Sequence, residues 1–316
     1  MPGANQQRRV ATIAAYAALC VIWSSTWLVI KVGLRDLPPV SFAALRFAIA
    51  IAALLLVSVG RVRLSPKRRG DYVLLGFTGL LMFSLNYGLL FWAEKHVSSG
   101  LAAVLQATIP IFGMWFAHLL LPSEPLRWQR VAGALLAMAG VALICGRLLG
   151  GNGLLAFWGG VGIVAGAGGA ALSNVLLKRR ALELAPAMIA AWQMVFGTVP
   201  MLVAGLILEG NPLHFHWTGM AWFCLLYLAL VGSALAFLLL YWLMPRMPVT
   251  NLQVISLITP PGAVALGWLA GGESLSAGSF AGGVLVLAGV WIIFRRLPAV
   301  ESPVLDESVD VAVPRG

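Results

Sequence analysis

The sequence contains few charged residues. Asp, Glu, Lys and Arg make up only 10% of its 316 residues, whereas 60% are hydrophobic. Soluble domains carry about 25% charged residues and roughly 45–50% apolar ones. A soluble fold would have no place to bury so much apolar surface, whereas a lipid bilayer accepts it. The shortage of charge therefore predicts an integral membrane protein.

Residues that build cofactor, metal or catalytic sites are also scarce. The three cysteines, Cys20, Cys145 and Cys224, lie inside or at the ends of apolar runs, and their spacing suggests neither a metal site nor a disulfide framework. No His-Glu-x-x-His motif and no paired Asp is present, and His214 and His216 have no third ligand nearby in the sequence. We therefore expect no cofactor, no metal and no enzyme activity.

What the chain has instead is long apolar runs. A helix needs about 20 apolar residues to cross the hydrocarbon core of a bilayer. Ten runs reach this length, and no segment between them is long enough for a soluble domain. They cover residues 10–31, 39–59, 71–93, 98–121, 128–147, 154–177, 186–208, 217–243, 250–270 and 276–294. The first run is long enough to be a retained helix, and the acidic tail 297–316 is predicted to be disordered.

The basic residues give the orientation. The net charge of +10 sits in short clusters between apolar runs, which indicates membrane topology and not nucleic-acid binding. With the N-terminus inside, 16 Lys and Arg residues fall in cytoplasmic segments and 4 in outer ones, while Arg46 lies within a span. This excess predicts that both termini are cytoplasmic, which requires an even number of spans.

The two halves of the chain match each other. Similar residues recur 147 to 150 positions apart, in register with the spans. The pairs are Thr26 and Ser173, Lys31 and Lys178, Pro39 and Pro186, Arg46 and Gln193, Phe91-Trp92 and Tyr241-Trp242, Pro110 and Pro260, Glu124 and Glu273, and Gly133 and Gly282. Since each half holds five spans, the second half enters the membrane from the opposite side. The predicted fold is all-α, with ten transmembrane helices as two inverted five-helix repeats, 1–150 and 151–296.

This pattern resembles the EamA-type branch of the drug/metabolite transporter superfamily. The residues that carry the resemblance are Trp23-Ser24-Ser25-Thr26, Lys31, Arg46-Phe47, Pro110, Glu124 and Leu126. It covers about residues 10–296, and within the superfamily the chain is most similar to YddG-like exporters of amino acids. The second half departs from the pattern at Ala170-Ala171-Leu172 and at Gln193. The resemblance implies a cavity lined mainly by the third, fourth, eighth and ninth spans, with the fifth and tenth at its edge.

The candidates for substrate binding are polar and aromatic residues of those four spans. They are Asn86, Tyr87, Trp92, Gln106, Ser233, Tyr241, Trp242, Gln253 and Ser256. Neutral hydrogen-bonding groups among aromatics suit a zwitterionic or amphipathic solute, and they suit a phosphorylated solute poorly because it needs several convergent cations. The alternative is that the aromatic residues form interface belts and the polar ones tie helices together.

Other residues are candidates for structural or gating roles. Arg46 is the one cation well inside a span, so it either holds a substrate carboxylate or braces neighbouring helices. Glu124 precedes a span and is expected to favour the start of that helix. The remaining candidates in this group are Trp23, Lys31, Pro110, Lys178 and Pro260.

No Asp or Glu lies in the middle of a span, and only His118 is placed to act as a proton relay. Facilitated movement down a gradient is therefore the preferred mechanism, with proton coupling left open. The resulting hypothesis is a multi-pass inner-membrane exporter of amino acids or similar metabolites, present as a monomer or weak homodimer. Its partners are the small-molecule substrate and the bilayer. The alternatives are a proton-coupled exporter of drugs or hydrophobic cations, a channel, a non-transporting scaffold and an intramembrane enzyme.

Overall fold

The structure is a computed structural model that describes residues 2–60, 65–94, 96–97, 99–145, 153–180, 183–271 and 277–295. Within these ranges the chain is helical and contains no β-strand, as the fold-class prediction requires. Glu273 and the predicted disordered tail 297–316 lie outside the described residues, as does the side chain of Cys145. Cys20 and Cys224 are buried free thiols.

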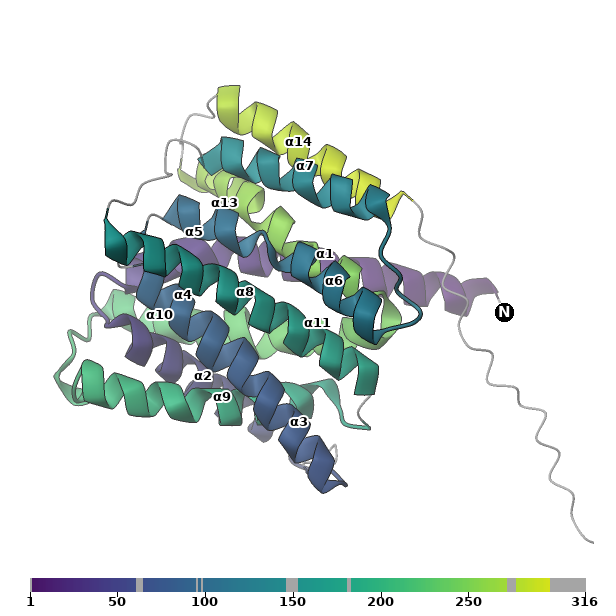
Figure 1. Ribbon diagram of the computed structural model, residues 1–316. Coiled ribbons are helices and arrows are strands. Elements are labelled where there is room, and N and C mark those ends of the chain that lie inside the picture. Colours follow the sequence, from purple (N-terminus) through teal and green to yellow (C-terminus); the bar gives the residue numbers. More distant parts are fainter. Residues whose placement is uncertain are drawn as a thin grey trace, which may run out of the picture.

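The helices pack side by side in one bundle (Figure 1). In chain order they are α1 (Pro2–Gly33), α2 (Pro39–Ser58), α3 (Arg69–Gly79), η1 (Leu80–Tyr87), α4 (Gly88–Ala93), α5 (Ser99–Gln106), α6 (Ile109–Leu120), α7 (Trp128–Cys145), α8 (Leu154–Arg180), α9 (Pro186–Leu208), η3 (Pro212–His214), α10 (Gly219–Ala229), η4 (Leu230–Leu235), α11 (Ala236–Leu243), η5 (Met244–Arg246), α12 (Val249–Gln253), α13 (Ile255–Gly271) and α14 (Ala277–Phe294).

Seven helical stretches of the described chain are long and apolar enough to cross a membrane. They are Gln6–Gly33, Pro39–Ser58, Arg69–Ala93, Ala102–Leu120, Leu154–Arg180, Pro186–Leu208 and Gly219–Arg246. Two shorter apolar helices are Trp128–Leu143 and Phe280–Phe294. These nine stretches coincide with nine of the ten predicted spans, and α12 with α13 occupies the position of the remaining one, 250–270.

Several spans are irregular in the middle. η1 and η4 are π-helical segments, and they begin at Leu80 and Leu230, 150 residues apart. A second interruption separates α5 from α6, where Pro110 occupies the first turn of α6 and removes a backbone donor. π-helical segments inside α-helices occur frequently at functional sites. The irregular segments therefore mark the third, fourth and eighth predicted spans as places to search for a site.

The helices α7 and α14 form an antiparallel pair at one side of the bundle (Figure 1). A Cβ atom on Gly133 would lie 2.7 Å from the carbonyl oxygen of Gly289, and one on Gly140 would lie 2.6 Å from that of Gly282. These contacts leave no room for a side chain, so Gly133, Gly140 and Gly289 allow the two backbones to touch.

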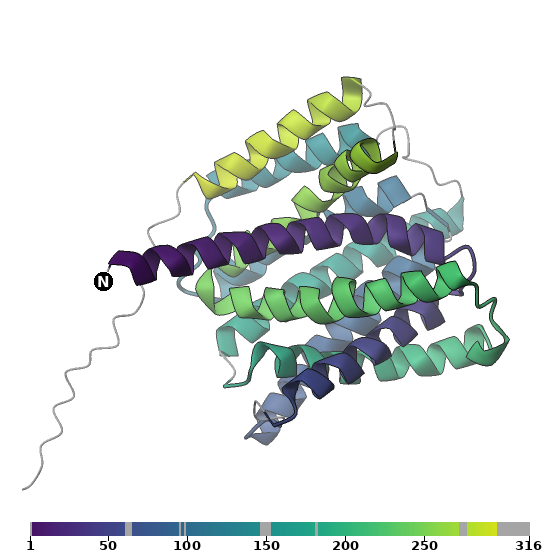
Figure 2. The ribbon, with the colours of Figure 1, turned by 180° about the vertical axis from the view of Figure 1, so that it is seen from behind.

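A large part of the core packs around α1 and a cluster of aromatic rings. Figure 2 shows α1 running the length of the bundle, in contact with α10 and α11 on one side and α13 on the other. Aromatic rings join α2, η1 and α11. They belong to Phe47, Phe83, Tyr87 and Phe237, and their centroids are 4.9 to 6.4 Å apart. Interlocking rings of this kind give a rigid wall.

The bundle has two ends, the N end and the far end. The N end is where α1 begins, and there α2 ends, α9 begins and α12 begins. The far end is where α1 ends and α2 begins.

Candidate functional site

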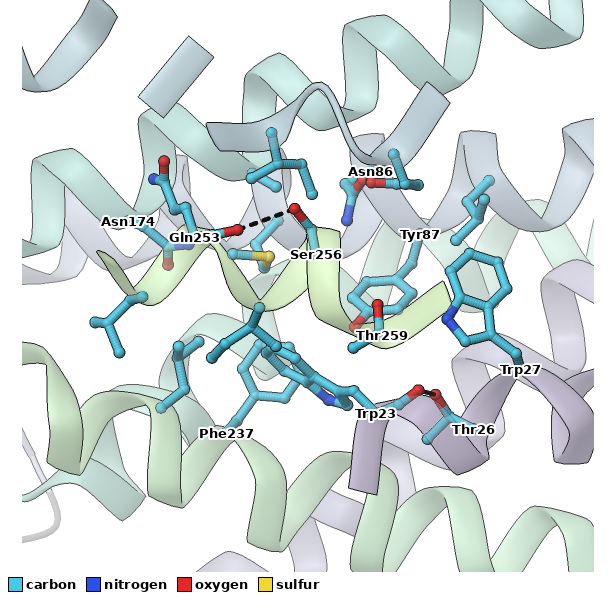
Figure 3. Close-up of a pocket in the computed structure, with 18 of the residues that line it drawn as sticks. Trp23, Thr26, Trp27, Asn86, Tyr87, Asn174, Phe237, Gln253, Ser256 and Thr259 are labelled. Carbon is cyan, nitrogen blue, oxygen red and sulfur yellow. Dashed lines mark hydrogen bonds between the residues drawn. The ribbon is translucent and has the colours of Figure 1, made fainter. Parts of the chain in front are cut away.

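A cavity of ≈ 130 Å³ lies inside the bundle. It is lined by side chains from α1, η1, α4, α5, α6, α8, α11, α12 and α13 (Figure 3). A single buried water needs roughly 10–15 Å³ of such space, so the cavity has room for a small organic solute. No charged side chain occurs among the described residues of the lining.

Amide and hydroxyl groups supply the polar part of the lining. Gln106 Nε2 donates to Asn86 Oδ1 at 2.9 Å, which ties α5 to η1. Gln253 Nε2 donates to the carbonyl of Ala171 at 3.1 Å, and Ser256 Oγ donates to the carbonyl of Gln253 at 2.9 Å (Figure 3). Gln253 Oε1 and Asn174 Oδ1 are buried without a hydrogen-bond partner. Gln253 Oε1 packs against Gly113 of α6, which is not part of the lining, so Asn174 Oδ1 is the unpartnered acceptor among these described lining residues that stays next to the cavity.

Aromatic rings supply much of the apolar wall. Trp23 and Trp27 come from α1, Tyr87 from η1 and Phe237 from α11 (Figure 3). Trp23 meets Phe237 edge to face at 5.7 Å and donates its indole N–H to the carbonyl of Gly232 at 3.4 Å. Aromatic walls of this kind fit apolar side chains and bind cations through their ring faces.

Five of the nine predicted substrate-binding residues line the cavity. These are Asn86, Tyr87, Gln106, Gln253 and Ser256. The sequence places them on four different helical segments, and the fold brings them together. Whether they bind substrate stays a prediction.

The other four predicted substrate-binding residues lie outside the lining. Trp92 packs against His96, Ser233 contacts Arg46, Tyr241 donates to Gln193, and Trp242 lies under the guanidinium of Arg246 at 3.8 Å. Each side chain therefore has a neighbour inside the protein that accounts for its position.

Sequence reasoning missed the contributions of α1 and α8. Thr26 and Trp27 of α1 and Asn174 of α8 line the cavity, and so does Trp23, which was expected to be structural or gating. A signal existed, because Thr26 and Ser173 are equivalent positions of the two halves and Asn174 follows directly. The implied lining by the third, fourth, eighth and ninth spans therefore has to be extended by the first and sixth.

Arg46 lies one layer behind the cavity wall and is 1% exposed. Its Nε donates to Ser233 Oγ at 3.0 Å, and its Cζ lies 4.8 Å from the ring centroid of Phe47 and 5.3 Å from that of Tyr87. Nη1 has no hydrogen-bond partner. The side chain thus braces α2 against η4 without using its full donor capacity.

The other predicted structural or gating residues lie in different surroundings. Lys178 donates to the carbonyls of Met244 and, at 2.7 Å, Met247, so it holds the end of η5. Lys31, its counterpart in the first half, is exposed. Pro110 and Pro260 are buried, one in the first turn of α6 and the other inside α13.

Glu124 acts on a different helix from the one that follows it in the chain. Its carboxylate accepts hydrogen bonds from Val249 N at 2.8 Å and from Thr250 N and Oγ1, both at 3.1 Å. It therefore caps the N-terminus of α12, which supplies Leu252 and Gln253 to the cavity. Arg130 Nη1 donates to the same Thr250 hydroxyl at 3.0 Å.

His118 is exposed, and its Nδ1 accepts a hydrogen bond from the backbone N–H of Leu126 at 3.3 Å. Among the described residues, no group of three or more His, Cys, Asp or Glu side chains is placed to hold a metal ion.

Comparison with known proteins places this architecture in a family. The EamA-like transporter family matches the chain twice, over residues 11–146 and 157–295. A protein of Escherichia coli (strain K12) described as "Uncharacterized inner membrane transporter YedA" is 31% identical over 93% of this chain and 96% of its own length. A protein of the same strain described as "Probable amino-acid metabolite efflux pump" is 30% identical over 86% of this chain and 91% of its own length.

One solved structure has the same fold. It covers 90% of this chain and 96% of its own length with a TM-score of 0.76 at 22% sequence identity. The family match, the relatives and the apolar helices agree with one another. The chain is a multi-pass inner-membrane transporter that belongs to the EamA-like transporter family.

Proposed function

We propose that the protein exports amino acids or similar small metabolites through the cavity described above. The observation that carries the proposal is the lining: amides, hydroxyls and aromatic rings, with no charged side chain among its described residues. Such a lining suits a solute whose net charge is zero, and its amide and hydroxyl oxygens suit an ammonium group. Relatives described as amino-acid metabolite efflux pumps support the same solute class.

The proposed transport mechanism is alternating access between two inverted repeats, 1–150 and 151–296, with ten spans and both termini in the cytoplasm. Two features support it. The π-helical segments start at equivalent positions of the halves, Leu80 and Leu230. The equivalent helices α7 and α14 lie antiparallel, which is the relation that an inverted repeat produces.

The proposed movement is facilitative. The described spans place no carboxylate in the cavity lining, and His118 contacts a turn and not the cavity. Proton coupling requires a group that titrates during the transport cycle, and the lining offers no such group at neutral pH.

The test is efflux from proteoliposomes that are preloaded with a panel of labelled amino acids, with and without an imposed pH gradient. We expect several amino acids to leave faster than from protein-free liposomes, and the gradient to have no effect. Trp27→Ala should reduce this efflux because it removes part of the cavity wall. Trp158→Ala is the matched control, since Trp158 is 53% exposed on the bundle surface.

A second candidate function is the export of hydrophobic cations, which the four aromatic rings of the wall favour through cation–π contacts. Efflux of such cations with no movement of any amino acid would support this candidate and contradict the amino-acid proposal. Movement of neither class would contradict both.

A further inference from the structure

The charge on Arg46 is not neutralised by an ion pair in the described part of the chain. The ion pairs found there join Lys67 to Glu183, Arg180 to Asp71 and His216 to Asp36, all at the ends of the bundle. The hydrogen bond from Arg46 goes to a neutral hydroxyl, and Nη1 has no partner. A buried cation without a counter-charge is costly, so its presence calls for an explanation.

Arg46 is close enough to the cavity to influence a solute there. The ring of Tyr87 contacts both of them: its centroid lies 5.3 Å from Arg46 Cζ, and Tyr87 is part of the cavity lining. A unit charge about 10 Å from another, in surroundings with an effective dielectric constant of about 20, changes a binding constant by roughly tenfold or more. The guanidinium can therefore act on a charged solute without touching it.

The equivalent position of the other half holds a neutral residue. Gln193 of α9 is fully buried, and both ends of its amide are partnered: Nε2 donates to Ser173 Oγ at 3.2 Å, and Oε1 accepts from the Tyr241 hydroxyl. A neutral, fully hydrogen-bonded side chain thus fills this position in the second half.

We propose that Arg46 is a specificity-determining residue, which makes the cavity favour solutes that carry a carboxylate over matched solutes that lack one. This inference rests on the proposed function and deepens it. The positive charge of the guanidinium acts on a solute in the cavity across the ring of Tyr87. It attracts the carboxylate of a zwitterion, and it weakens the binding of a solute that carries only an ammonium group. The lining itself then needs no cation.

The test uses competition in proteoliposomes. The assay follows the efflux of a labelled amino acid that the wild-type protein moves. The competitor is either the same unlabelled amino acid or its amide. The amide keeps the side chain and the ammonium group but has no carboxylate. We expect the wild-type protein to bind the amino acid about tenfold or more tightly than the amide. Arg46→Gln copies the residue of the second half and should bring this ratio close to one.

Two variants separate the charge from the contacts of the side chain. Arg46→Lys keeps the charge and should keep the ratio, although it cannot form the same hydrogen bonds. Ser233→Ala removes the hydrogen bond of Arg46, leaves the charge in place, and should also keep the ratio. A merely structural role predicts the opposite pattern, because Ser233→Ala would then resemble Arg46→Gln.

If Arg46→Gln does not fold, Ser233→Asp decides the question. It places a carboxylate against the guanidinium and should lower the ratio while Arg46 stays in place. A folded Arg46→Gln or Ser233→Asp variant with the wild-type ratio overturns the inference and leaves the proposed function standing. A wild-type protein that moves no amino acid overturns both.

Discussion

At each end of the bundle, a carboxylate accepts hydrogen bonds from the start of a helix, but the carboxylates at the two ends differ in burial. At the N end, Glu124 is 6% exposed and accepts three hydrogen bonds from the start of α12. At the far end, Glu209 is half-buried and accepts two, from Val40 N at 3.0 Å and Ser41 N at 2.7 Å, and Asp36 is half-buried as well.

This difference in burial indicates which end of the bundle is held more firmly. A charge-assisted hydrogen bond is worth more when water is excluded, so the buried tie at the N end should stabilise the fold more than the ties at the far end. α12 carries two residues of the cavity lining, whereas α2 carries none. The firmer tie therefore fixes the side of the cavity that faces the N end.

The largest effect is expected for Glu124→Ala. It leaves the buried N–H groups of Val249 and Thr250 without an acceptor, which should lower the free energy of unfolding by about 2–4 kcal/mol. Thermal unfolding in lipid nanodiscs, followed by tryptophan fluorescence, measures the change. Glu124→Gln keeps one acceptor oxygen and should lose about half as much. A loss below about 0.5 kcal/mol for the alanine variant, the range of ordinary surface substitutions, would contradict the role of this tie.

Lys178→Met addresses a second contact at the N end. Lys178 donates to the carbonyls of Met244 and Met247, and a cation at a partly buried helix C-terminus contributes up to about 2 kcal/mol. We expect a loss of about 1–2 kcal/mol in the same unfolding assay. Lys31→Met is the matched control, because Lys31 is the exposed counterpart in the first half, and its loss should be much smaller. Equal losses of stability for Lys178→Met and Lys31→Met would contradict the expectation that the N end is held more firmly than the far end.

These ties also show how far the sequence leads. The apolar runs predict the helices well, because the length of a span follows directly from the thickness of a bilayer. The orientation that the basic clusters indicate stays a prediction. The partner of Glu124 could not be predicted: its position before α7 suggested a local effect, and only the tertiary packing brings α12 next to it. The same holds for Lys178, whose acceptors lie 66 and 69 residues away.

The cavity illustrates a second limit. Five of its lining residues could be predicted from the sequence, because polar residues are rare in apolar spans and are therefore easy to recognise there. Trp27 and Asn174 were missed because a span that is apolar all round gives no periodic signal for the face that meets the cavity. The burial of Arg46 followed from its place in the sequence, but its position behind Tyr87 required the structure.

Glu209→Gln tests the far end and should have a smaller effect than Glu124→Ala. The carboxylate spans the first two backbone N–H groups of α2, and an amide can accept from only one of them. Because the site is half-buried, we expect a loss of about 1 kcal/mol in the nanodisc assay. Raising the salt concentration should reduce the difference between this variant and the wild-type protein, since partly exposed charges are screened. No such reduction is expected for Glu124→Gln, and an equal salt response at both sites would contradict the difference in burial.

The smallest effect is expected for Asp36→Asn, and it should depend on pH. The hydrogen bond from Thr218, together with His216 nearby, lowers the pKa of the Asp36 carboxyl below its usual value of 3.8. A carboxyl whose pKa is depressed by folding stabilises the protein above the pKa of the unfolded chain, and this contribution is lost as the pH falls through the lower folded value. The wild-type protein should therefore unfold at a slightly higher temperature than Asp36→Asn at pH 7, and the two should converge below about pH 4. Thr218→Val removes the main donor, so in that background Asp36→Asn should have a smaller effect, which is the part that comes from His216. A difference between the wild-type protein and Asp36→Asn that stays constant from pH 7 to pH 3 would show that the charge of Asp36 does not stabilise the far end.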